Sequence, residues 1–299
     1  MDRASPQSPL LPFVAALMGV GFLSLMDAFM KEAALTTGTY TATVLRSLIG
    51  AAIIAPFWLW KRTGWPDRAT MKLHLERGII SAIMALSFFY SLTKLPLAEA
   101  IALSFIAPLI ALYLARILLA EVIQPQAIFA SLLGFAGTLV IISGKIGQGE
   151  FDEDVGLGLA ALLFSALLYA YNFIVIRKQS QVAGPVEVAT FHSGVGGIVL
   201  LLLAPFLATP IETEALLPLA AAGVLTVLGA MALAWAYARA EAQALVPIEY
   251  SGFLWASLLG WVFFQEAVTW PTLTGTGLIV TGCLLATRKA QRHENPVVS

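Results

Sequence analysis

Ionisable side chains are scarce inside the long apolar stretches of this chain, and four of them stand out. They are Asp27, Arg46, His192 and Glu249. A charge in hydrocarbon is energetically costly, so such residues tend to face a protein interior or an aqueous cavity and to mark ligand or proton pathways. These four residues are therefore our first candidates for function.

Asp27 and Arg46 lie at similar distances from the polar turn at 36–39. If the segments flanking this turn are antiparallel neighbours, the two side chains reach the same depth and can form an ion pair. A position in a cavity would make both substrate-binding residues, with Asp27 also a candidate for proton coupling. The alternative is structural: a buried pair, or a bond from Asp27 to Lys31 one helical turn further along.

Glu249 follows Pro247 in the motif VPIEYSGF and has no Lys or Arg within one helical turn. Apolar burial favours a neutral carboxyl group that can be reprotonated, so Glu249 is the first candidate for proton coupling. Alternatively, it bonds a carbonyl group freed by the proline. Pro108 and Pro247 are the predicted helix breaks. His192 is a second proton-coupling candidate because imidazole titrates near neutral pH, although a single histidine is often a packing residue.

Aromatic side chains inside the apolar stretches can stack on a flat or cationic cargo. Those that we predict to bind substrate come from both halves of the chain: Tyr90, Tyr171, Trp235, Tyr237, Tyr250 and Trp255. Asn172, beside Tyr171, adds a polar contact. The alternative for each ring is packing against lipid or a neighbouring helix. Tryptophans at the ends of the apolar stretches indicate an interfacial belt instead.

The composition places these residues in a membrane protein. Hydrophobic residues make up 59% of the chain and charged residues 12%, with a mean hydropathy of +0.85, whereas soluble domains are about 25% charged. The net charge is -1 and Cys283 is the only cysteine, which argues against nucleic-acid binding and a disulfide framework. We find no P-loop, HExxH, GxSxG or metal-ligand motif. We therefore expect neither an enzyme nor a cofactor or metal site.

A bilayer core needs about 20 predominantly apolar residues per helix, and the chain contains ten such runs. They are 12–33, 40–60, 76–93, 97–119 and 126–143, followed by 156–176, 186–208, 216–238, 243–264 and 271–287. The predicted fold class is all-α with ten transmembrane helices. The predicted units are a tail (1–11), a first repeat (12–143), an acidic linker (144–155), a second repeat (156–287) and a second tail (288–299).

Basic residues predict the orientation, because Lys and Arg are enriched in cytoplasmic loops. Those between the second and third runs, between the sixth and seventh, and after the tenth all fall on one side: Lys61, Arg62, Arg68, Lys72, Arg177, Lys178, Arg288, Lys289 and Arg292. Both termini are therefore expected in the cytoplasm and the acidic linker outside, in a cell membrane of the bacterial inner-membrane type. Because each half has five helices, which is an odd number, the second half enters the membrane from the opposite side. The two repeats are therefore inverted.

The stretches 97–121 and 243–266 are degenerate copies of one pattern. Each follows a helix that ends in aromatic residues, closes on a glutamate (Glu121 or Glu266), and leads into a proline and a Gly-rich apolar run. We interpret the two glutamates as helix-end anchors. The arrangement resembles the EamA domains of the drug/metabolite transporter superfamily over about 12–287. The resemblance implies transport and leaves the cargo open, since members carry amino acids, cofactors, vitamins, choline or drugs.

We therefore expect a secondary active transporter that moves a small polar or zwitterionic metabolite by alternating access. Export of an amino acid or a derivative is our first interpretation, with protons as the candidate coupling ion. Uptake or exchange of a nucleoside-like or cofactor-like cargo, of the S-adenosylmethionine or riboflavin type, is the alternative. A membrane-embedded transferase is disfavoured because no His, Asp or Glu cluster marks a membrane face. The expected partners are the cargo and the lipid bilayer, while the oligomeric state stays open.

Overall fold

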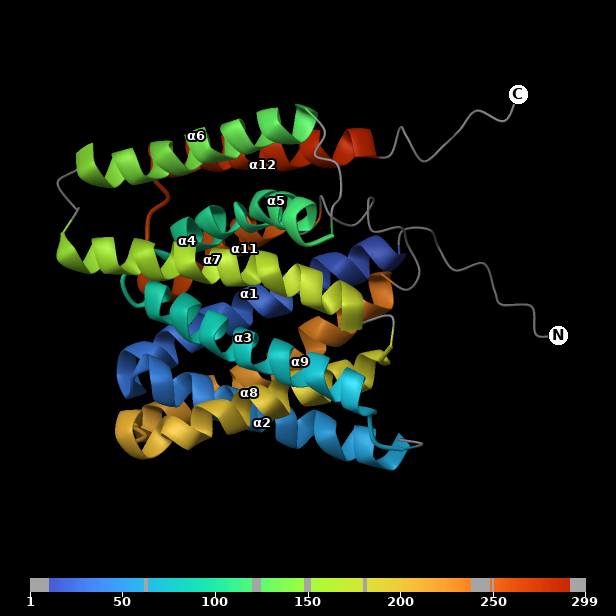
Figure 1. Ribbon diagram of the computed structural model, residues 1–299. Helices are drawn as coiled ribbons and strands as arrows, with labels where there is room; N and C mark the ends of the chain where they lie inside the picture. The colour runs from blue at the N-terminus through green and yellow to red at the C-terminus, as the bar shows by residue number, and fades with distance from the viewer. Residues whose placement is uncertain are drawn as a thin grey trace, which may run out of the picture.

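The computed structural model describes residues 11–61, 64–119, 125–147, 152–179, 182–237, 248 and 250–290. All regular structure in these residues is helical (Figure 1), which confirms the predicted all-α fold. The first half contains α1 (Leu11–Thr37), α2 (Thr39–Lys61), α3 (Arg68–Leu92), α4 (Leu97–Ser104), α5 (Ala107–Leu119) and α6 (Pro125–Gly147). The second half contains α7 (Glu153–Gln179), α8 (Pro185–Leu207), the short turn η1 (Thr213–Ala215), α9 (Leu216–Tyr237), α11 (Ser251–Phe264) and α12 (Trp270–Ala290).

The helices correspond to the ten predicted runs when α4 and α5 are counted as one interrupted span. By length and composition, six helices of the described residues can cross a membrane: α1, α2, α3, α7, α8 and α9. The interruption falls at Phe105 and Ile106, whose N–H groups reach carbonyl oxygens only three residues back, both at 3.2 Å. Pro108 follows in the first turn of α5 and has no N–H to continue the α-helical pattern.

Local chemistry explains two of the helix boundaries. The third predicted run begins too late, because Asp67 caps α3 by accepting a hydrogen bond from the Thr70 N–H at 2.8 Å. Hydrogen bonding from Thr70 stabilises the carboxylate and holds the pKa of Asp67 below its ordinary value. Between α1 and α2, Gly38 has a φ of 86°, and a Cβ there would lie 2.9 Å from Thr209 Oγ1. Glycine therefore permits a one-residue turn that packs against the end of α8.

The two halves of the chain interlock. Extensive packing joins α1 to α9 and α3 to α7, and these two pairings exchange when the halves are exchanged. Equivalent helices of the two halves also pair with each other: α2 with α8, α4 with α11, and α6 with α12 (Figure 1). A packing pattern that survives exchange of the halves is expected for an inverted repeat about a pseudo-two-fold axis.

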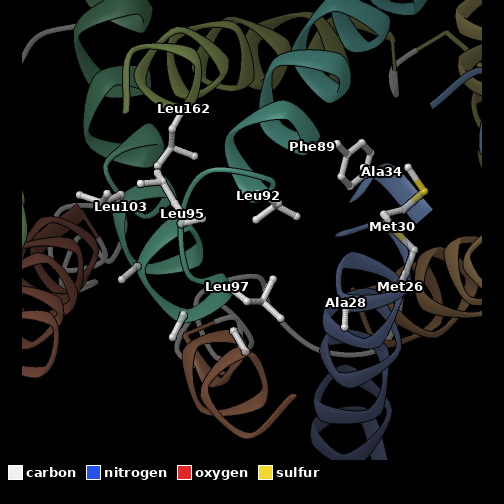
Figure 2. Packing of buried hydrophobic residues seen from close by; sticks show 14 of the residues in the cluster. Met26, Ala28, Met30, Ala34, Phe89, Leu92, Leu95, Leu97, Leu103 and Leu162 are labelled. Carbon is white, nitrogen blue, oxygen red and sulfur yellow. The ribbon is translucent and has the colours of Figure 1, made fainter. Parts of the chain in front are cut away.

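The main apolar core lies at the end of the bundle where α1 and α3 finish and α4, α7 and α9 begin. In Figure 2, Met30 and Ala34 of α1 lie beside Phe89 of α3, while Leu95 and Leu162 lie together between α4 and α7. The polar groups around Arg46 and Arg77 lie nearer the middle and the opposite end of the bundle, whereas Lys31 and Glu99 lie at this end.

The peripheral pair α6 and α12 packs backbone to backbone. A Cβ on Gly137 would lie 2.5 Å from the Gly275 carbonyl oxygen, and one on Gly275 would lie 2.5 Å from the Gly137 carbonyl oxygen. Only glycine permits this approach on both sides. The small residues of these two helices are therefore explained by packing.

Candidate functional site

A polar pocket lies where α2, α3, α8 and α9 meet. Its polar lining comes from all four helices: Arg46, Ser47, Ser81, His192, Ser193 and Thr226. Since α2 is equivalent to α8 and α3 to α9, each half of the chain supplies two walls. Secondary transporters place their substrate sites at such an interface between repeats.

The guanidinium group of Arg46 is the main charge in this pocket. Its Cζ lies 5.1 Å from the ring centroid of Phe89, which is a cation–π contact. Asp27 on α1 is near enough for the two charges to interact, yet among the described residues Asp27 and Arg46 share no ion pair or hydrogen bond. Their approach to hydrogen-bonding distance stays a prediction for another conformational state.

Three side-chain atoms in the pocket are buried without a hydrogen-bond partner in the described part of the chain. They are Arg46 Nε, Ser81 Oγ and His192 Nδ1. His192 also lies within electrostatic range of both Arg46 and Arg77. Because buried polar atoms in folded proteins nearly always have partners, this concentration indicates a site for a ligand or for water.

Arg46 and His192 occupy equivalent positions in the two repeats. Each is the eighth residue of its helix, and each begins a matching pattern, RSLIG in α2 and HSGVG in α8. The Arg or His, the Ser and the Gly of both patterns all line the pocket. The pocket is therefore built from one motif used twice, with the charge altered in the second copy.

Another arginine, Arg77 of α3, is buried and has quite different surroundings. Its Nε donates to Asn172 Oδ1 at 3.3 Å, and its Nη1 donates to Gln179 Oε1 at 2.9 Å. The amide nitrogen of Gln179 lies 2.5 Å from Nδ1 of His74, whose Nε2 lies 3.0 Å from Glu187 Oε1. Arg77 thus orients the Gln179 amide, which in turn favours the His74 tautomer that donates from Nε2 to Glu187. The network joins α3, α7 and α8.

At the opposite end of the bundle, Lys31 and Glu266 form a mostly buried ion pair between α1 and the end of α11. Lys31 Nζ also donates to the Leu95 carbonyl oxygen at 2.8 Å, and the second carboxylate oxygen of Glu266 accepts from the Leu97 N–H at 2.7 Å. Glu266 therefore caps α4, which confirms its interpretation as an anchor. Nearby, the buried Glu99 of α4 accepts from Thr272 Oγ1 of α12 at 3.2 Å.

The predicted aromatic residues do not gather at one place. Tyr90 lines a second, more open pocket with Tyr40, Ser87 and Thr209, near the start of α2 and the end of α3. Tyr171 instead donates to Glu76 Oε1 at 2.6 Å. The predicted polar contact Asn172 is the acceptor of Arg77 described above.

Tyr250 and Trp255 lie at α11, which packs against α1 and α4, and neither residue lines the two pockets. The Tyr250 ring meets Phe105 edge to face, with ring centroids 5.2 Å apart, so the break between α4 and α5 contacts the start of α11. Trp255 packs on α1, where a Cβ on Gly21 would lie 3.2 Å from the indole.

The other predicted residues lie at the end of α9 or outside the described residues. Trp235 lies half-buried in the last turn of α9, and Tyr237 ends that helix. Glu249 and Pro247 lie outside the described residues. The roles of these residues, like those of the aromatic residues above, stay predictions.

Sequence reasoning missed several buried polar residues, among them Arg77, Glu99 and Gln179. Arg77 lies inside the third predicted run and, as a basic residue in an apolar stretch, had the same signal as Arg46. Glu99 lies near the start of a predicted helix, where a carboxylate is easily assigned to the membrane surface. Gln179 lies beyond the end of the sixth predicted run, but α7 extends to include it and it is fully buried.

Known proteins resemble this chain along most of its length. The model of the EamA-like transporter family matches residues 10–143 and again residues 156–288. The pseudopaline exporter of Pseudomonas aeruginosa is 26% identical over 270 residues, covering 89% of this chain and 92% of that protein. A riboflavin transporter of Rhizobium johnstonii is 30% identical over 78% of this chain and 74% of its own length. An S-adenosylmethionine uptake transporter of Rickettsia felis is 24% identical, covering 93% and 97%.

A solved crystal structure shares the fold. It aligns with a TM-score of 0.63 and 21% identity, covering 94% of this chain and 99% of its own. The double family match, the interlocked helices and the polar pocket between the repeats lead to one conclusion. The chain belongs to the EamA-like transporter family and is a multi-pass membrane transporter, not an enzyme.

Proposed function

We propose that the protein is a secondary active transporter of a small zwitterionic metabolite, with an amino acid or a derivative as the exported cargo. The observation that carries this proposal is the relation between Asp27 and Arg46. Their opposite charges interact electrostatically, but neither side chain has a hydrogen-bond or ion-pair partner among the described residues. A zwitterion supplies both missing partners, an ammonium group for Asp27 and a carboxylate for Arg46.

The position of these charges suits alternating access. Asp27 lies on α1 and Arg46 on α2 of the first half, while the facing wall of the pocket comes from α8 and α9 of the second half. A cargo held between the halves is exposed to one side or the other when the halves rearrange around it. The presence of the pseudopaline exporter among the relatives is consistent with outward transport.

A cofactor-like cargo is the second candidate. Tyr40 and Tyr90 line the open pocket near the start of α2, where the stacking of a flat ring is possible. The names of the relatives from Rhizobium johnstonii and Rickettsia felis, a riboflavin transporter and an S-adenosylmethionine uptake transporter, point in the same direction.

We place the end of the bundle that contains the start of α3 and the ends of α2 and α7 in the cytoplasm of a bacterial inner membrane. The basic clusters of the sequence gather at this end (Figure 1), which suits the enrichment of Lys and Arg on the cytoplasmic side. Both termini then lie in the cytoplasm. Labelling of a cysteine introduced at Asp152 should occur only from outside the cell, and labelling only from the cytoplasmic side would reverse the orientation.

Proton coupling is proposed to depend on Glu249, because in the sequence this carboxylate falls inside an apolar run and follows Pro247, with no Lys or Arg within one helical turn. Glu249→Gln should abolish accumulation driven by a proton gradient in reconstituted vesicles while leaving exchange of cargo partly intact. Wild-type dependence on the proton gradient in this variant would exclude the role and make Asp27 the leading candidate.

Cargo identification is the decisive experiment. The purified protein would be screened for thermal stabilisation by a metabolite library, because a compound that binds only the folded state must raise the unfolding temperature. Hits would then be tested for transport in vesicles. We expect amino acids or their derivatives among the hits, and a hit list confined to flavins and nucleosides would favour the second candidate. If no metabolite both binds and is transported, the proposed function is wrong.

A further inference from the structure

The pocket between α2, α3, α8 and α9 collects most of the unpaired buried polar atoms in the described part of the protein. Of the four side-chain atoms there that are buried without a partner, three belong to this pocket: Arg46 Nε, Ser81 Oγ and His192 Nδ1. The fourth, Ser251 Oγ, is not among the lining atoms. A buried polar atom that stays unpaired is energetically costly. Three on three different helices are better explained by a bound group than by chance.

All three atoms can donate a hydrogen bond, so they favour a ligand group that accepts hydrogen bonds. Arg46 can only donate, Ser81 can donate through its hydroxyl, and His192 donates from Nδ1 in one of its neutral tautomers and in its charged form. A carboxylate oxygen accepts several hydrogen bonds at once, and such bonds to an ionised acceptor are among the strongest in proteins. An ammonium group, which only donates, would leave the Arg46 donor unpaired and would be repelled by the guanidinium.

The local charges also favour an anion. Two basic side chains, Arg46 and Arg77, and one acidic side chain, Asp27, interact electrostatically around the pocket, so basic groups outnumber acidic ones there. Arg77 is hydrogen-bonded to neutral amides only in the described residues, so its charge is not cancelled by a direct ion pair. A monovalent carboxylate would balance this excess within the apolar interior.

We propose that this pocket is a subsite for the carboxylate of the cargo, bound by Arg46 together with Ser81 and His192. The proposal rests on the proposed transport function and adds to it the donors that recognise one end of the molecule. Because Arg46 and His192 are equivalent residues of opposite repeats, a carboxylate between them contacts both halves of the transporter. The same donors would accept a small inorganic anion, so the experiment must separate the two sources.

The test compares acids with their own amides. Thermal stabilisation of the full-length purified protein is measured with free amino acids and with the corresponding amino-acid amides, at equal ionic strength in a chloride-free buffer. The amide keeps the size and the amino group of each compound and removes only the anionic acceptor. We expect stabilisation by at least one acid, with an apparent affinity about tenfold or more above that of its amide. Chloride and nitrate are tested separately.

Variants assign the effect to the pocket. Arg46→Gln should weaken binding of the acid about tenfold or more and leave weak binding of the amide unchanged. Ser81→Ala, which removes one donor without altering charge, should weaken binding of the acid by a smaller factor. Ser251→Ala is the matched control, because it deletes a buried unpaired hydroxyl outside the pocket. It should leave the preference for the acid intact.

Several results would overturn the subsite. Equal stabilisation by acids and amides would show that the pocket does not bind a carboxylate. Unchanged binding of the acid in both Arg46→Gln and Ser81→Ala would show the same. Stabilisation by chloride or nitrate as strong as that by the acids would assign the pocket to an inorganic anion. If no acid binds, the subsite is also wrong, and vesicle transport of neutral and cationic metabolites then decides separately whether the proposed function fails.

Discussion

Arg77, which is buried, and Arg46, which is half-buried, lie on neighbouring helices of the same half and use their donors in opposite ways. Arg77 is only 8% exposed and its guanidinium bonds Asn172 and Gln179 on α7. Arg46 has a cation–π contact with Phe89 and no hydrogen bond in the described residues. The comparison separates a side chain that holds the fold from one whose donors are available to a ligand.

The difference follows from what each arginine faces. Arg77 meets amide side chains from α7, and those amides in turn connect it to His74 and Glu187, so the chain itself supplies acceptors. Arg46 meets serines, glycines and the equivalent His192 across the repeat interface, and in the described residues it forms no ion pair with Asp27. Loss of the Arg77 interactions should therefore lower the free energy of unfolding, whereas loss of the Arg46 interactions should weaken cargo binding.

The largest loss of stability is expected for Arg77→Met. The substitution leaves the oxygen atoms of Asn172 and Gln179 without their donor, and the free energy of unfolding should fall by about 3 kcal/mol. Unfolding of the purified protein in detergent, followed by tryptophan fluorescence, measures the change. Lys72→Met is the control, because Lys72 lies exposed on the same helix. If the two variants lose equal stability, the network around Arg77 does not hold the fold.

A smaller loss is expected for Lys31→Met at the opposite end of the bundle. The variant removes the ion pair with Glu266 and the bond to the Leu95 carbonyl. Glu266 keeps the Leu97 N–H and 18% side-chain exposure, so the loss should be about 2 kcal/mol, below the value for a fully buried pair. Lys94→Met breaks the more exposed pair with Asp154 and is the matched control. A larger effect for Lys94 would contradict the importance of burial.

The sequence was sufficient to predict the fold because its main signals are local. Hydropathy marks the spans, and the odd number of spans in each half sets the inverted arrangement. The signal for the end of α4 is also local, because Pro108 lies just beyond that end. The start of α3 was placed too late, since the helix begins at the Asp67 cap, in a segment that is too polar to belong to an apolar run.

The site could be predicted only in part. Asp27, Arg46 and His192 were identified because a charge inside an apolar run is conspicuous in any sequence. The Arg77 network was not, since Arg77 and its partners Asn172 and Gln179 are 95 and 102 residues apart. No periodicity or motif reports such a pairing. For the same reason the sequence did not reveal that the oxygen of Asn172 accepts a hydrogen bond from Arg77. The predicted contact of Asn172 with substrate stays a prediction.

The smallest effect on stability is expected at Arg46, although its loss should be the most harmful to cargo binding. Arg46→Met removes the contact with Phe89, which is worth about 0.5–1 kcal/mol, but it also removes a guanidinium that has no hydrogen bond in the described residues. The free energy of unfolding should therefore stay within about 1 kcal/mol of the wild type, as it can when a poorly compensated buried charge is replaced by an apolar side chain. Asp27→Asn measures the other half of the interaction. If the two charges support each other, Asp27→Asn combined with Arg46→Gln should be milder in both folding and transport than either single change, whereas additive losses would show that the charges act independently. A loss at Arg46 as large as that at Arg77 would remove the distinction between the two arginines and return Arg46 to a structural role.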